Sequence, residues 1–271
     1  MIFDSHCHPQ FPQYDKDREE VFKRTLEQGV FMICVGTDLE TSKQGIELAQ
    51  AYENIWAAVG IHPNDSEVLN ITNNVLREFE NLLNNKKVVA VGEVGVDYYR
   101  TTDINKQEKQ REIFGKFIEL ACKHKKPLII HVRDAGKGST GKIHLDMVSI
   151  LKQYNFYHDR EMDYIPRTGV MHSFTGSTDD AKKYLDLGFY LGFNGIITFA
   201  RQYDEVIKYT PLENILLETD APYLTPEPYR GQRNEPTYVI EVAKKIAELK
   251  NEPLEKVIEI TTKNCQNLFN I

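Results

Sequence analysis

The sequence predicts an α/β fold of the (β/α)8 TIM-barrel class, and two observations support this. Segments rich in β-branched and aromatic residues alternate with longer, amphipathic, charge-rich stretches along the whole chain. Strands that alternate with helices in this way form parallel sheets. The chain has 271 residues, which suits a barrel of eight such units. A doubly wound open sheet of fewer strands is the alternative, because open sheets of eight strands are uncommon.

The strand and helix segments can be assigned in order along the chain. The eight predicted strands are residues 2–6, 30–36, 55–60, 88–93, 127–131, 169–172, 189–192 and 215–218. The helical patterns between and after them are residues 15–28, 41–52, 75–84, 106–123, 143–151, 178–186 and 237–249. Each unit therefore supplies one strand and the connection that returns the chain to the next parallel strand.

We predict a single barrel domain spanning residues 1–271, with an elaborated loop region at 134–168 after the fifth strand. Residues 136–142 in this region satisfy the GxxxxGK pattern of a P-loop. Ile143 follows, however, where a P-loop needs Ser or Thr to hold magnesium. We therefore interpret this segment as a flexible loop and not as a nucleotide site.

The composition is that of an ordinary soluble protein, with 41% hydrophobic and 27% charged residues. No apolar run reaches the roughly 20 residues of a membrane span, and no secretory signal is visible. Four widely spaced cysteines fit a reducing compartment. We expect a cytoplasmic protein with no membrane contact and no obligate protein partner. The net charge of −7 disfavours broad electrostatic binding of DNA, so a nuclease would need local positive charge from metal ions and a few arginines.

His6 and His8 form an H-x-H pair at the end of the first predicted strand. Side chains two apart on an extended segment face the same way, so both imidazoles can reach one ion. Cys7 then points to the opposite side and is a poor candidate ligand.

Further polar side chains end or closely follow other predicted strands. They are His62, Glu93, His131, His172 and Asp220. The carboxyl ends of barrel strands converge on one rim, where barrel enzymes place their active sites. Each residue alone is better explained as a hydrogen-bonded core histidine or a capped carboxylate, but the convergence of the whole set favours a metal site. The remaining histidines, His124, His144 and His158, are expected to face solvent.

The predicted ligands exceed the needs of one tetrahedral ion. They are His6, His8, Glu93, His131, His172 and Asp220. Four imidazoles and two carboxylates predict two divalent cations that share a carboxylate. We expect Glu93 to be shared, His131 and His172 to hold the second cation, and the other three to surround the first with Glu93. Asp220 is the best candidate to accept a proton from the attacking water. The ligand types leave magnesium, manganese and zinc open, with cobalt or iron also compatible.

With these residues assigned, the chain resembles the TatD family of metal-dependent deoxyribonucleases, within the amidohydrolase-like barrels. The resemblance covers essentially the whole chain, and its ordered set of motifs is specific although each one alone is not. The motifs are Phe3-Asp4-Ser5-His6-Cys7-His8, Gly60-Ile61-His62-Pro63, Gly92-Glu93-Val94-Gly95-Val96-Asp97-Tyr98, Ile130-His131-Val132-Arg133-Asp134-Ala135, Met171-His172-Ser173-Phe174-Thr175-Gly176, Leu217-Glu218-Thr219-Asp220-Ala221-Pro222-Tyr223-Leu224 and Arg230-Gly231-Gln232-Arg233-Asn234-Glu235-Pro236.

The resemblance implies a TIM-barrel hydrolase that cleaves DNA with two divalent cations. It implies metal binding at the six positions given above and catalytic roles for Glu93, Asp220 and His62. It also implies that His62 and Arg133 contact the scissile phosphate, and a guanidinium near a metal ligand suits bidentate phosphate binding. A salt bridge to a neighbouring carboxylate explains Arg133 equally well. The chain departs from the family in the long 134–168 region.

Two other function classes remain open on the sequence. A hydrolase of a small C–N or ester substrate would use the same metal scaffold. A barrel that keeps its metal but serves as a binding or scaffold protein is the third class, although the intact ligand set gives it no support. Arg230 and Arg233 are candidates to steer a nucleic-acid strand, although exposed loop arginines are often merely solvated.

Overall fold

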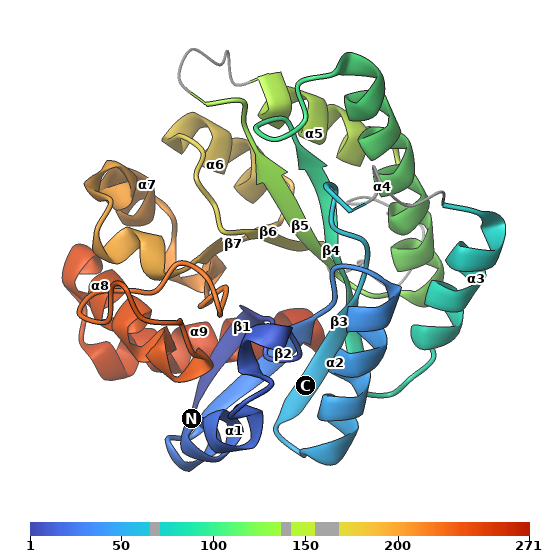
Figure 1. The fold of residues 1–271 in the computed structure, drawn as a ribbon. Coiled ribbons are helices and arrows are strands. Elements are labelled where there is room, and N and C mark those ends of the chain that lie inside the picture. The colour runs from blue at the N-terminus through green and yellow to red at the C-terminus, as the bar shows by residue number, and fades with distance from the viewer. Residues whose placement is uncertain (66–70, 137–141, 155–167) are drawn as a thin grey trace.

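The computed structural model describes residues 1–65, 71–136, 142–154 and 168–271. Within these residues, eight parallel strands form a nearly closed barrel in which each strand pairs with the next one along the chain (Figure 1). The strands are β1 (Ile2–Cys7), β2 (Val30–Val35), β3 (Ile55–Val59), β4 (Val88–Asp97), β5 (Leu128–Arg133), β6 (Gly169–His172), β7 (Tyr190–Phe193) and β8 (Ile215–Leu217). The predicted barrel is confirmed. A doubly wound sheet would reverse its strand order, which this sheet does not.

The barrel closes where β8 meets β1. The amide of Asp220 donates to the carbonyl of His6 at 3.0 Å, and the amide of His8 donates to the carbonyl of Ala221 at 2.8 Å. The hydroxyl of Ser5 also donates to the carbonyl of Leu217 at 2.9 Å. The segment that carries Asp220 is therefore joined directly to the segment that carries the H-x-H pair.

Helices form the layer outside the strands (Figure 1). They are α1 (Arg18–Glu27), α2 (Leu39–Ala51), α3 (Asn73–Leu82), α4 (Ile104–His124), α5 (Lys142–Gln153), α6 (Thr178–Asp186), α7 (Asp204–Tyr209), α8 (Val239–Lys250) and α9 (Leu254–Phe269). Short 3-10 helices occur at η1 (Pro12–Tyr14), η2 (Gly195–Thr198), η3 (Arg201–Tyr203), η4 (Leu212–Asn214) and η5 (Pro236–Tyr238). Several starts are capped: the side chain of Asp38 accepts from the amide of Thr41 at 2.7 Å, and Ser177 forms a capping box with Asp180.

Two hydrophobic clusters fill the molecule, one between the strands and the outer helices and one inside the barrel. The inner cluster includes Ile129, Val170 and Leu216 and is continuous with Cys265, Leu268 and Phe269 of α9. Helix α9 therefore closes the amino end of the barrel with apolar side chains. Because side chains alternate along a strand, the residues two positions beyond the inner ones also face the barrel interior, at its carboxyl end.

Strand β4 is longer than predicted, because it continues past Glu93 to Asp97. Its second half stays paired with β5, with Gly95 opposite His131 and Asp97 opposite Arg133. Gly95 has a φ of 147°, and a Cβ there would overlap the carbonyl oxygen of His131. Glycine thus lets β4 approach β5 closely at this position. We had expected Glu93 at the end of this strand, but it lies within the strand.

The 134–168 region contains α5, which begins at Lys142. Residues 137–141 and 155–167, which include most of the P-loop-like segment and His158, lie outside the described residues. His144 on α5 corrects the prediction of a solvent-facing side chain, because it is only 6% exposed. Its Nδ1 lies 2.9 Å from the hydroxyl of Tyr184 on α6. His144 shares the inner face of α5 with Met147, three residues later, so it is covered by the neighbouring helix.

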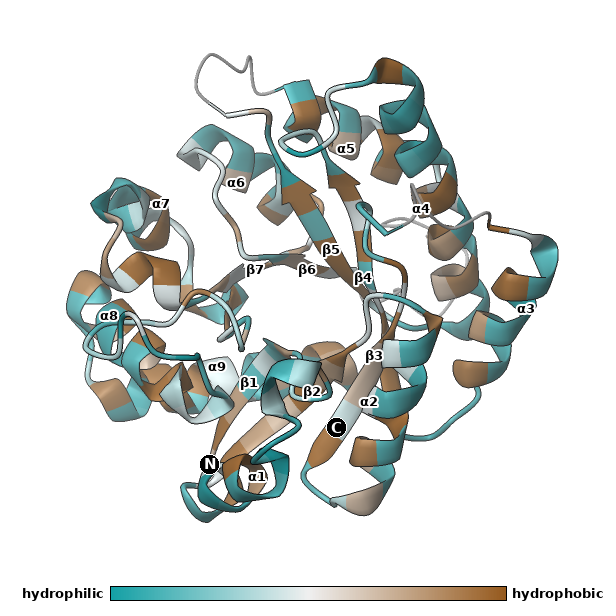
Figure 2. Ribbon diagram, in the orientation of Figure 1, coloured by the Kyte–Doolittle hydropathy of each residue, from teal (hydrophilic) through white to brown (hydrophobic). Residues whose placement is uncertain are grey.

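Hydrophobic and hydrophilic residues alternate around the helices of the outer layer (Figure 2). This pattern is typical of helices that bury one face against a sheet and expose the other. In the part of the chain that the structure describes, none of the helices combines the length and the apolar character needed to traverse a bilayer.

Candidate metal centre

His6 and His8 place their imidazoles side by side at the carboxyl end of β1. Their Nε2 atoms lie 3.1 Å apart, and both residues are buried, with 0% and 2% exposure. Cys7 between them belongs to the cluster under the outer helices. The H-x-H pair therefore faces one common point, as the alternation along the strand predicted.

The carboxylate of Glu93 lies at the centre of the site and is only 3% exposed. Its Oε2 faces the H-x-H pair, at 3.3 Å from Nε2 of His6 and 3.8 Å from Nε2 of His8. Its Oε1 faces His131, whose Nδ1 is 2.8 Å away, and His62, whose Nε2 is 3.6 Å away. The two oxygens of one carboxylate thus face two separate groups of imidazoles.

Asp220 and His172 complete the cluster from the side of β8 and β6. Oδ1 of Asp220 lies 3.5 Å from Nε2 of His8 and 3.6 Å from Nε2 of His172. The ring of His172 stacks on that of His6 with centroids 3.5 Å apart. Nε2 of His172 is 3.9 Å from Oε1 of Glu93. The structure thus brings together all six residues that the sequence suggested as ligands.

The donor atoms fall into groups that fit divalent cations. Among the described residues, three sets have donor atoms within 4.8 Å of one another: His6, His8 and Glu93; His62, Glu93 and His131; and His6, His172 and Glu218. Two of these sets share Glu93, which is the arrangement expected of a carboxylate between two ions. The grouping differs from our expectation in two respects. His62 joins His131 near Oε1 of Glu93, and Nε2 of His172 lies near both Oε1 of Glu93 and Oδ1 of Asp220, at 3.9 and 3.6 Å.

The protonation states of Glu93 and His6 favour cation binding. Although burial opposes ionisation of Glu93, the nearby His62, His131 and His6 hold its pKa well below the usual range. Burial lowers the pKa of His6 to about 4, so its imidazole is neutral near pH 7 and free to donate an electron pair. Nitrogen and oxygen donors of this kind suit zinc, manganese or iron.

Comparison with known proteins places this centre in a family. Residues 3–270 match the family model described as TatD related DNase. The chain belongs to the TatD family. It is 40% identical over 274 residues to the metal-dependent hydrolase YabD of Bacillus subtilis (strain 168), with 100% of both chains covered. It is 35% identical over 278 residues to the metal-dependent hydrolase YcfH of Escherichia coli (strain K12), which covers 100% of this chain and 96% of YcfH.

A solved structure supports the same assignment. The crystal structure of YjjV, a TatD homologue from Escherichia coli K12, matches with a TM-score of 0.86 and 31% identity, covering 100% of this chain and 98% of YjjV. These comparisons identify the chain as a metal-dependent hydrolase of the TatD family.

In this TatD protein, two carboxylates that we had not predicted as site residues orient the imidazoles from behind. Oδ2 of Asp97 lies 3.2 Å from Nε2 of His131, and Oε2 of Glu218 lies 2.9 Å from Nδ1 of His172. Asp97 and Glu218 are 1% and 0% exposed. Carboxylates in this position fix the ring and the tautomer of a metal-ligating histidine. A signal was present in the sequence, because each carboxylate ends or follows an otherwise apolar strand.

Glu218 depends on a glycine in the neighbouring strand. A Cβ on Gly192 of β7 would overlap the carboxylate oxygens of Glu218. The carboxylate instead lies against the bare backbone of β7, where Oε2 also accepts from the amide of Ser173 at 2.9 Å. Glu218 thereby raises the pKa of His172 to about 10, although burial opposes the shift.

The arginines that we proposed for phosphate binding or steering lie at the rim. Arg133 is exposed, with its guanidinium 4.1 Å from the ring centroid of Tyr99. Arg230 lies 3.9 Å from the ring centroid of Phe199. Arg233, by contrast, forms two hydrogen bonds of 2.7 Å with the carboxylate of Asp17. The charge of Arg233 is thus neutralised within the protein, which argues against a steering role.

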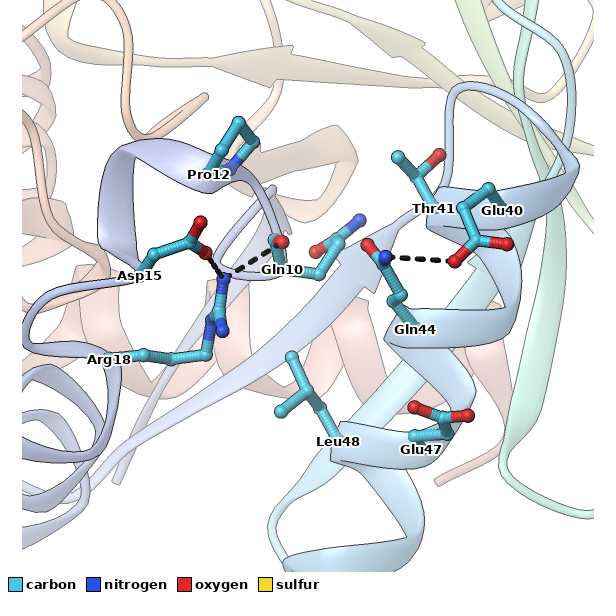
Figure 3. A pocket seen from close by; sticks show the side chains of 9 residues that line it. All are labelled: Gln10, Pro12, Asp15, Arg18, Glu40, Thr41, Gln44, Glu47 and Leu48. Carbon is cyan, nitrogen blue, oxygen red and sulfur yellow. Dashed lines mark hydrogen bonds and ion pairs between the residues drawn. The ribbon is translucent and has the colours of Figure 1, made fainter.

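A separate cleft of about 540 Å³ lies between η1 and α2 (Figure 3). Three carboxylates, those of Asp15, Glu40 and Glu47, line it together with Arg18. The guanidinium of Arg18 is already 2.6 Å from Asp15. The acidic lining makes this cleft unsuitable for a phosphate.

Proposed function

We propose that this TatD protein is a deoxyribonuclease that hydrolyses phosphodiester bonds of DNA with two divalent cations. The observation that carries the proposal is the division of the two oxygens of Glu93 between two groups of imidazoles. The description of the matching family as TatD related DNase supports DNA as the substrate.

The residues that would hold the cations are the six that meet around Glu93. His6, His8 and Asp220 would bind one cation with Glu93, while His131 and His172 would bind the other. Bound divalent cations supply positive charge to a phosphodiester and lower the pKa of water, so that hydrolysis proceeds near neutral pH. His62 approaches Oε1 of Glu93 at 3.6 Å and remains 18% exposed, so it can serve both this group and a phosphate oxygen.

Asp220 is placed to accept the proton of the attacking water. Its side chain is 16% exposed, whereas that of Glu93 is 4% exposed, so Asp220 is the carboxylate that solvent reaches more easily. Nearby His8, His172 and His6 keep its pKa below the usual range although burial opposes this. An ionised, partly accessible carboxylate is what a general base requires. Arg133 at the rim would bind a phosphate oxygen of the substrate strand.

The test is cleavage of end-labelled single- and double-stranded oligonucleotides by protein that has been freed of metal and then supplied with magnesium, manganese or zinc. We expect cation-dependent cleavage that Glu93→Gln and Asp220→Asn reduce by at least a hundredfold. Glu205→Gln is the matched control, because Glu205 is 80% exposed on α7. Circular dichroism checks that each variant is folded. Full activity of either site variant, or hydrolysis of small esters or amides with no cleavage of DNA, would contradict the proposal.

A further inference from the structure

Two tyrosines stand at the open end of the barrel with about half of their surface exposed. Tyr99 is 52% exposed and Tyr223 is 48% exposed, although most large aromatic side chains in the described residues are buried. Tyr99 follows Asp97, the carboxylate that contacts His131, by two residues. Tyr223 follows Asp220 by three residues, and its amide donates to the carbonyl of Asp220 at 2.8 Å.

The topology puts these tyrosines on opposite sides of the metal centre. Tyr99 follows β4 and Tyr223 follows β8, and β8 lies four positions after β4 in the ring of eight described strands. Positions four strands apart in such a ring face each other across the barrel axis. The cluster around Glu93 lies between them, since its ligands come from β1, β4, β5 and β6 and from the segment after β8.

Each tyrosine ring contacts a side chain that lies next to the ligand cluster or at its rim. The ring of Phe11 stacks on His8 with centroids 4.6 Å apart, and it makes an edge contact with Tyr223 at 6.4 Å. On the other side, the guanidinium of Arg133 lies 4.1 Å from the ring centroid of Tyr99. The rings are thus positioned relative to the ligands and are not simply exposed loop side chains.

Because the protein carries a net negative charge, base stacking on these rings can supply binding affinity that electrostatic attraction does not. The net charge is −7, and Arg233 is neutralised by Asp17, so a polyanion receives little general attraction from the protein. Proteins that bind single strands gain sequence-independent affinity by stacking bases on aromatic rings. A base paired inside a duplex does not offer its face to such a ring.

We propose that Tyr99 and Tyr223 are stacking platforms for the two bases on either side of the scissile phosphate. This inference rests on the proposed nuclease function. Arg133 then contributes twice, since it supports the ring of Tyr99 and supplies positive charge beside the phosphate.

The experiment compares a substrate with bases to one without. The dinucleotide TpT has one phosphodiester between two bases, and an analogue with tetrahydrofuran in place of both sugar–base units keeps the phosphodiester but lacks the bases. We expect Tyr99→Ala and Tyr223→Ala each to raise KM for TpT about tenfold relative to KM for the analogue, within the range for base–aromatic stacking. Tyr99→Phe and Tyr223→Phe keep the ring and should behave like the wild type.

A binding measurement supplies a readout apart from activity. Fluorescence anisotropy of a labelled oligothymidylate, recorded with EDTA to prevent turnover, should show the same loss of affinity in the alanine variants. Tyr209→Ala is the matched control, because Tyr209 is 44% exposed at the end of α7 that leads into β8, away from the mouth of the barrel.

The outcomes separate this inference from the proposed function. If the wild type cleaves TpT and the alanine variants cleave and bind as well as it does, the stacking role is wrong while the nuclease function stands. If the phenylalanine variants lose as much as the alanine variants, the hydroxyl matters and stacking is again wrong. If the wild type cleaves no nucleic acid under any cation, the proposed function fails and this inference fails with it.

Discussion

Replacing Glu218 with glutamine removes a negative charge that faces His172 and leaves the volume of the side chain unchanged. Oε2 of Glu218 accepts from Nδ1 of His172 at 2.9 Å and from the amide of Ser173 at 2.9 Å. If the amide oxygen of glutamine takes the place of Oε2, both hydrogen bonds remain but lose the charge of the carboxylate. The amide nitrogen then occupies the place of Oε1, which has no hydrogen-bond partner among the described residues.

The expected loss follows from these contacts. Hydrogen bonds to a charged group contribute roughly 1.5–3 kcal/mol and neutral ones roughly 0.5–1.5 kcal/mol, so weakening the bond to His172 costs about 1–2 kcal/mol. That energy corresponds to a decrease of about tenfold in cation affinity for the site in which His172 is neutral, in line with the effect of removing the carboxylate behind a ligating histidine. Gly192→Ala should produce a similar decrease, because its methyl group would displace the carboxylate of Glu218.

The assay is a competition for zinc or manganese between the protein and a chromophoric chelator, with Glu205→Gln as the control. Urea unfolding without metal separates loss of affinity from loss of folding, since a bound cation adds stability only in proportion to its affinity. If Glu218→Gln unfolds like the wild type and binds both cations with unchanged affinity, the proposed role of Glu218 in orienting His172 is refuted.

Three further predictions concern the same site and its support. Asp97→Asn should weaken cation binding about tenfold in the same competition assay, because Oδ2 of Asp97 holds His131 at 3.2 Å, whereas binding like the wild type would exclude this role. Leu268→Ala should lower the free energy of unfolding by about 2–5 kcal/mol in urea but preserve cation stoichiometry. Leu268 is 2% exposed and belongs to the apolar side chains of α9 that close the amino end of the barrel, which we call the plug. Cation affinity should rise with pH between 6 and 9. The rise should be up to about tenfold per pH unit for each proton that cation binding releases. The raised pKa of His172, about 10, keeps it protonated over this range, so the cation must displace a proton. Calorimetry in buffers of different ionisation enthalpy measures that proton, and a pH-independent affinity would contradict the assignment of His172 as a ligand.

Much of the fold was predictable because the strands carry a strong local signal. Apolar runs such as residues 128–130 and 215–217 are buried on both faces, and their connections are short enough that parallel order follows the chain. The convergence of His6, Glu93 and Asp220 then followed from topology alone, since the carboxyl ends of all barrel strands share one rim.

The remaining errors concern contacts between distant segments. We ended the fourth strand at Glu93, so Asp97 was not recognised as facing the same interior as Glu93 and His131. His144 was expected in solvent because its partner, Tyr184, comes from a helix forty residues away. Helix periodicity shows that a face is apolar but does not show which neighbouring helix covers a polar side chain on it.

The alternation along each strand links the stability of the barrel to its chemistry. Ile129 and Val170 fill the barrel interior, and two residues later on the same strands His131 and His172 face the open end. The inner apolar layer, closed from below by α9, excludes water from beneath the ligands. Because the apolar layer and the ligand layer occupy different heights on the same strands, substitutions in one should leave the other largely intact. Stability and cation affinity are therefore expected to vary independently, and a variant in the plug that lost both in proportion would show that the two layers act as one unit.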